Sequence, residues 1–80
     1  MEFYQLVVNE IKKIVKDIFD GEIQEDMRLK EDLSFNSLRL LTLLTQMNLL
    51  ANVDMFEASE KIADMITVKD TVMILDHYRK

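Results

Sequence analysis

The sequence predicts a small all-α fold, a four-helix bundle of three longer helices and one short one, with a long loop between the first two. The chain of 80 residues contains no proline and one glycine, Gly21, which disfavours a turn-rich β fold. It contains no cysteine, so no disulfide can support so small a core. Hydrophobic residues make up 49% of it and recur at helical spacing. We expect one domain over residues 1–80.

The first helix is expected from Phe3 to Phe19. Its apolar residues recur at steps of three and four and form one stripe: Phe3, Val7, Ile11, Ile14, Val15 and Ile18. Glu10 and the other charged residues fall largely outside this stripe. Gly21 closely follows Asp20, which fits a C-terminal stop.

Residues 21–35 form a long, charged connection. A loop of this length in a compact domain is uncommon unless it is ordered or functional. We expect four spaced apolar residues to anchor it over the helices: Ile23, Met27, Leu29 and Leu33. The sequence allows one short turn of helix around Gln24 to Leu29.

The second helix is expected from Ser37 to about Leu50, with Asn36 as its N-cap. One face carries the apolar set Leu40, Leu43, Leu44, Met47 and Leu50. Another face carries Leu38, Leu41, Thr45 and Leu49, and is more apolar than a solvated surface needs to be. Two explanations stay open for its leucines: burial under the loop or third helix, or docking of a partner.

A short third helix is expected from about Met55 to Ala63, with Phe56, Ile62 and Ala63 directed inward. Thr67 and Asp70 then form a capping box, in which aspartate replaces the usual Glu or Gln. The last helix follows from Val68 to about Tyr78, with Val68, Val72, Leu75 and Tyr78 directed inward.

Charge and hydropathy exclude several classes of protein. The net charge of −5 disfavours nucleic-acid binding, which depends on phosphate contacts, and suits attraction to basic partners. The start Met1-Glu2-Phe3-Tyr4 lacks the basic segment and apolar run of a signal peptide. The most apolar stretch, residues 38–53, is too short and too interrupted to span a bilayer. We therefore expect a cytoplasmic monomer.

Ser37 is the strongest candidate for a functional residue. Behind Asn36 it falls in the first turn of the second helix, where unpaired backbone N–H groups and the helix dipole favour a phosphate. The position suits a serine that carries a phosphate-linked group. It does not suit a serine that acts alone as a nucleophile.

The run Asp32-Leu33-Ser34-Phe35-Asn36-Ser37-Leu38 resembles the acyl carrier protein family, whose motif is close to Asp-Leu-Gly-x-Asp-Ser-Leu. The resemblance covers nearly the whole chain, including Glu60-Lys61-Ile62 and Ile66-Thr67-Val68. It implies a non-catalytic carrier: a phosphopantetheinyl transferase would move 4′-phosphopantetheine from coenzyme A onto Ser37. The imported thiol would hold acyl or aminoacyl groups as thioesters and deliver them to loading and transferring enzymes.

Three departures from the family pattern concern the surroundings of Ser37. Asn36 replaces the family's aspartate, Ser34 replaces its glycine, and Arg39 stands where an acid is common. From Ser37 to Val53 there is no carboxylate. This favours a specialised pathway of the polyketide or nonribosomal peptide type over housekeeping fatty-acid synthesis. Partners would then dock mainly on apolar contacts, at Leu38, Arg39, Leu41 and Thr45.

The sequence allows other interpretations. An unmodified helical interaction module with a carrier-like fold is the main alternative, in which Ser37 is an ordinary first-turn serine. Ser34 is better explained as a loop or capping residue, and His77 as an end-of-helix contact rather than a catalytic group. The pairs Glu25-Asp26 and Glu31-Asp32 lack the alternating ligands of a calcium loop, so no metal is expected. A single cation, Arg39, argues against a membrane-surface helix.

Overall fold

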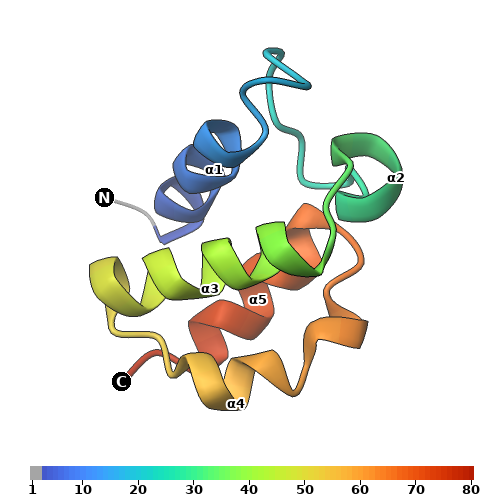
Figure 1. Cartoon of the computed structure of the whole chain (residues 1–80). Coiled ribbons are helices and arrows are strands. Elements are labelled where there is room, and N and C mark those ends of the chain that lie inside the picture. Colours follow the sequence, from blue (N-terminus) through green and yellow to red (C-terminus); the bar gives the residue numbers. More distant parts are fainter. Residues whose placement is uncertain (1–2) are drawn as a thin grey trace.

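A computed structural model describes residues 3–80. Met1 and Glu2 lie outside it, so the expectation about a signal peptide, which concerns the start of the chain, falls partly outside the described residues. These residues form five α-helices, one 3₁₀-helix and no β-strand, so the predicted all-α class is confirmed. The elements are α1 (Phe3–Ile14), α2 (Leu29–Leu33), α3 (Ser37–Ala51), α4 (Met55–Ser59), η1 (Ile62–Asp64) and α5 (Val68–His77). Figure 1 shows α3 crossing in front of α5, with α1 on one side of it and α4 on the other.

Helix α1 is shorter than predicted. It ends at Ile14 rather than Phe19, and a tight turn follows in which the N–H groups of Ile18 and Phe19 both donate to the carbonyl of Val15 at 2.8 Å. The turn leaves Ile18 exposed, so its predicted burial is wrong. Val7, Ile11 and Val15 are fully buried as predicted.

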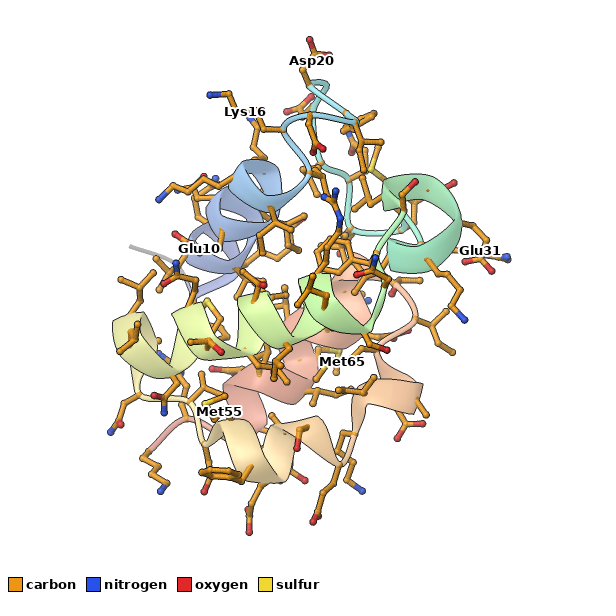
Figure 2. The ribbon with its side chains drawn as sticks, in the orientation of Figure 1. Glu10, Lys16, Asp20, Glu31, Met55 and Met65 are labelled. Atoms are coloured by element: carbon orange, nitrogen blue, oxygen red, sulfur yellow. The ribbon has the colours of Figure 1, made fainter. Side chains whose placement is uncertain are left out.

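Glu10 lies against the core rather than outside the apolar stripe. It is 4% exposed and sits on α1 near α3 (Figure 2), and its carboxylate pairs with Lys13 Nζ at 3.1 Å. The alternation of apolar and charged residues predicted the opposite. A buried carboxylate is tolerated here because the long side chain of Lys13 supplies a cation from the solvent side.

The loop after α1 is anchored as expected, but its helical turn lies elsewhere. Ile23, Leu29 and Leu33 are buried and Met27 is partly buried. The turn predicted around Gln24 to Leu29 forms instead as α2, Leu29–Leu33, because the Asp32 carboxylate accepts a hydrogen bond from the Arg28 backbone N–H at 2.8 Å. The loop is therefore ordered and packs against the core.

Helix α3 matches its predicted bounds within one residue. Leu43, Leu44 and Met47 are fully buried, whereas Leu50, assigned to the same face, is exposed because it lies at the end of the helix. Asn52 ends α3 in the left-handed conformation, with φ of 58°.

The predicted third helix is divided into two short elements. Helix α4 stops at Ser59 and η1 follows, so the single helix expected from Met55 to Ala63 does not form. Ala58 faces the core and is fully buried. Phe56 and Ala63 are exposed, which contradicts their predicted burial, and Ile62 is partly buried.

Helix α5 begins at the predicted capping box. Asp70 N–H donates to Thr67 Oγ1 at 3.0 Å, and Thr67 N–H donates to the Asp70 carboxylate at 3.2 Å. Val68 and Leu75 are fully buried, and Val72 and Tyr78 pack partly buried against the same core.

Two short backbone pairings close the fold. Leu29 N–H donates to Ile66 O and Val68 N–H to Met27 O, each at 2.9 Å, which joins the first loop to the start of α5. Asp54 N–H donates to Tyr78 O at 2.9 Å, which joins the start of α4 to the end of α5. These pairings fix the α4–η1 segment at both ends.

Candidate functional site

Ser37 is the first residue of α3 and is exposed to solvent. The predicted cap is confirmed, because Asn36 Oδ1 accepts a hydrogen bond from the Arg39 backbone N–H at 2.9 Å. The N–H groups of Ser37 and Leu38 precede the first intrahelical bond, so helix geometry gives them no partner within α3. An anion attached at Ser37 Oγ would meet these donors and the positive end of the helix dipole.

The residues before Ser37 form a turn that is packed against the core. Leu33 and Phe35 are buried, and Phe35 N–H donates to the carbonyl of Leu29 at 2.8 Å. Between them Ser34 adopts φ of 56° and ψ of 34°, a left-handed conformation that favours glycine. The resemblance places a glycine at this position, and the serine here holds the same backbone shape at a conformational cost.

Arg39 joins the start of α3 to the end of α1. Its Nη1 donates to the carbonyl of Ile14 at 2.6 Å, and its Nη2 approaches the carboxylate of Asp17 at 3.4 Å. The guanidinium donates a hydrogen bond to the carbonyl of the last residue of α1. This bond helps to explain why the helix stops at Ile14. Arg39 was expected among the docking residues, but its charged group is bonded within the molecule.

A cleft of about 400 Å³ opens beside Ser37. Its walls come from α2, from the start of α3 and from the segment around η1, and it is lined by Leu29, Lys30, Glu31, Phe35, Asn36, Ser37, Leu40, Ile62, Ala63, Met65 and Ile66. In Figure 2, Met65 lies between α3 and the η1 segment, and Glu31 projects from the outer side of α2. The cleft is therefore apolar inside, with charged groups at its α2 side.

The second face of α3 is open to solvent. Leu38 is 72% exposed, Leu41 49% and Leu49 73%, so within residues 3–80 neither the loop nor α4 covers them. With Thr42, Thr45 and Gln46 they line a shallow groove of about 270 Å³. The hydroxyls of Thr42 and Thr45 donate to the carbonyls of Leu38 and Leu41 at 2.9 Å, so this face offers few free donors.

The single histidine lies apart from the cleft beside Ser37. His77 lies edge-on to Tyr78, with ring centroids 4.8 Å apart, and lines a separate groove with Met73 and Lys61. Among residues 3–80 no group of three or more His, Cys, Asp or Glu side chains is placed to hold a metal ion. In the same residues no helix is long and apolar enough to cross a membrane.

Sequence reasoning found Ser37 and its cap but missed the cleft. Phe35 is far along the chain from Ile62, Met65 and Ile66, and backbone pairing between the first loop and the start of α5 brings the two segments together. One signal in the sequence could have indicated the cleft. Ile62, Met65 and Ile66 are apolar but do not form the stripe of a helix, so they are available to line a cleft.

Comparisons with known proteins identify no relative: no family model, no curated protein and no solved structure matches this chain.

Proposed function

We propose that the protein is a carrier that holds acyl or aminoacyl intermediates on a 4′-phosphopantetheine arm attached to Ser37. The observation that carries this proposal is an exposed serine at the capped start of a long helix, beside an apolar cleft. The bound group would supply a thiol that this cysteine-free chain lacks, and that thiol would hold the cargo as a thioester. The protein itself would catalyse nothing.

The chain's own residues would accept and orient the arm. In the transfer, Ser37 Oγ would form a bond to the pantetheine-bearing phosphorus of coenzyme A, the diphosphate bond would break, and adenosine 3′,5′-bisphosphate would leave. A base on the transferase would take the serine proton. The free N–H groups of Ser37 and Leu38 would then face the new phosphodiester.

The cleft supports an apolar or partly apolar cargo. Buried Leu29, Phe35 and Met65 are among its lining residues, and its mouth is beside Ser37, within reach of a flexible arm. Removing apolar groups of the cargo from water there would stabilise the loaded state by about 25 cal/mol per Å² buried.

Delivery would depend on partners that dock on the open face of α3. Leu38, Leu41 and Thr45 line one groove on α3, which begins at the residue after Ser37. Arg39 is held by Ile14 and Asp17, so we assign it to positioning α3 more than to partner contact. Since α3 bears no carboxylate, docking through this face should depend little on salt. This neutral face favours a specialised pathway of the polyketide or nonribosomal peptide type.

In this proposal the fold is a four-helix carrier bundle. Helices α1, α3 and α5 are its long members, α4 is its short member, and α2 is an ordered turn of the first loop. The protein would act as a cytoplasmic monomer.

An unmodified interaction module is the second candidate, favoured by the same exposed leucines of α3. Co-expression with a broad-range phosphopantetheinyl transferase and measurement of the intact mass distinguish the two. The carrier proposal predicts a gain equal to one phosphopantetheinyl group in the wild type and none in Ser37→Ala. Unchanged mass with several transferases of different specificity would favour the module.

A further inference from the structure

The single glycine of the chain follows an aspartate at the tip of the first loop. Asp20 and Gly21 lie between α1 and α2 and are both exposed, and Figure 2 shows Asp20 at the end of the molecule beyond α1. Among residues 3–80, no backbone hydrogen bond involves residues 20–22, and no ion pair involves Asp20. The Asp20 carboxyl group and the Gly21 backbone N–H are therefore both accessible.

Gly21 cannot carry a side chain unless a neighbouring ring moves. A Cβ atom at this residue would lie 2.8 Å from Cζ of Phe19 and 3.4 Å from its Cε1 and Cε2. Phe19 is partly buried and packs against the core, so its ring occupies the space beside Gly21. The packing of Phe19 therefore favours glycine at position 21.

An aspartate followed by glycine can form a cyclic imide with its own backbone. The Gly21 backbone nitrogen forms a bond to Cγ of Asp20, and the carboxyl hydroxyl leaves as water with the proton from that nitrogen. Water then adds to the main-chain carbonyl carbon of Asp20, whose bond to the Gly21 nitrogen breaks. The chain now continues through the Asp20 side chain as isoaspartate, with unchanged mass. Glycine favours ring closure, because without Cβ its nitrogen is unhindered and its backbone rotates freely.

We propose that Asp20 is a site of spontaneous isoaspartate formation in the folded protein, and that the conversion weakens the packing of Phe19. No other aspartate or asparagine precedes a glycine. Isoaspartate adds one carbon to the main chain between Phe19 and Gly21, so their close contact cannot be kept. Most other aspartates also have carboxylates held by a donor or a cation: Asp17, Asp32, Asp54, Asp70 and Asp76.

The first test follows isoaspartate in the wild-type protein during storage at neutral pH and physiological temperature. An isoaspartyl methyltransferase measures its amount by transferring a methyl group from S-adenosylmethionine to the isoaspartate carboxyl group, and fragment mass spectrometry locates it. We expect isoaspartate to accumulate at residue 20, at an initial rate within tenfold of the rate in guanidinium-unfolded protein. A larger difference would show that the fold protects the site and would overturn the proposal, as would the absence of isoaspartate at residue 20.

Two conservative variants decide whether Asp20 is responsible. Asp20→Glu keeps the charge but would need a larger, less favourable ring, so it should lower isoaspartate formation in the folded protein at least fivefold. Asp26→Glu is the same change at another exposed aspartate of this loop and should alter the rate less than twofold. Equal rates in Asp20→Glu and the wild type would contradict the assignment.

The stability of the converted protein tests the effect on Phe19. The isoaspartate form, separated from the parent by ion-exchange chromatography, should unfold at a lower urea concentration, because Phe19 loses packing against the core. In Phe19→Ala the two forms should differ by less than half as much. Equal urea midpoints for the two wild-type forms, or an undiminished difference in Phe19→Ala, would overturn this part of the proposal.

Discussion

At the scale of single residues, Ser34 and Asn52 share an uncommon backbone conformation. Both have φ near 57° and both end a helix, α2 and α3 respectively. Asparagine tolerates this region better than serine, because its side chain can hydrogen-bond locally. Strain is therefore greater at Ser34, which lies just before the candidate modification site.

Replacement of Ser34 with glycine should stabilise the protein. Glycine adopts the left-handed region without steric cost, which raises the free energy of unfolding. The greater conformational freedom of glycine in the unfolded chain offsets part of this gain and leaves a net stabilisation of about 0.5 kcal/mol. Urea denaturation followed by circular dichroism measures this difference. Asn52→Gly is the control and should change the free energy of unfolding less. If Ser34→Gly lowered stability, an interaction of the serine side chain would have to account for it.

At the scale of elements, Arg39 links α1 and α3. Arg39→Ala should lower the free energy of unfolding by about 1 to 2 kcal/mol, because the carbonyl of Ile14 loses a charged hydrogen-bond donor. Asp17→Asn is the control: its ion pair is exposed and 3.4 Å long, and should contribute less than about 0.5 kcal/mol. If Arg39→Ala were as stable as the wild type, Arg39 would be better explained as a residue that contacts a partner.

The open face of α3 gives a prediction that separates docking from stability. Leu41→Asp should leave the fold intact, with a stability change within about 0.5 kcal/mol, since Leu41 is half exposed. It should lower the rate of acyl transfer to a partner enzyme at least tenfold, because a charge would enter an apolar contact. Thermal unfolding and single-turnover transfer assays measure the two effects.

Leu44→Ala provides the matched control on the same helix. Leu44 is fully buried, so its truncation should cost about 2 to 5 kcal/mol. A comparable loss in Leu41→Asp would show that Leu41 belongs to the core.

At the scale of the whole molecule, the contact between Asp54 and the end of α5 predicts an acid response. The Glu57 backbone N–H holds the pKa of the Asp54 carboxyl below its ordinary 3.8, and Lys80 acts in the same direction against partial desolvation. A lowered pKa in the folded state stabilises the protein above the unfolded pKa, and this stability is lost as pH falls through the folded value. The relevant window is below about pH 4.

Asp54→Asn should therefore lose less stability than the wild type when the pH is lowered from 5 to 3, measured by urea denaturation at each pH. Asp20→Asn, at the exposed tip of the first loop, is the control and should follow the wild type (Figure 2). An unchanged pH dependence in Asp54→Asn would contradict the role given to this carboxylate.

A helix end can be predicted from the sequence when the residue that fixes it is a near neighbour in the chain. The starts of α3 and α5 follow from Asn36 and Thr67, whose side chains bond within their own first turn, so their positions were predicted correctly. The end of α1 depends on Arg39, far along the chain, and could not be read from residues 15–19.

The errors in burial have the same physical origin. Periodicity identifies a stripe on a helix but not whether a neighbouring element covers it. It therefore predicts Phe56 in the core and Glu10 at the surface, and both predictions are wrong. At the candidate site, the position of Ser37 was predictable because its cap is local. The cleft was not, because long-range backbone pairing assembles it.

The carrier proposal requires that Ser37, and not another hydroxyl, bears the phosphopantetheinyl arm. The most direct measurement is fragment mass spectrometry of the protein after treatment with coenzyme A and a broad-range transferase. We expect one modified peptide with the added group on Ser37. The modification should be unchanged in Ser34→Ala and absent in Ser37→Ala. Modification at Ser34, or persistence of the added mass in Ser37→Ala, would contradict it.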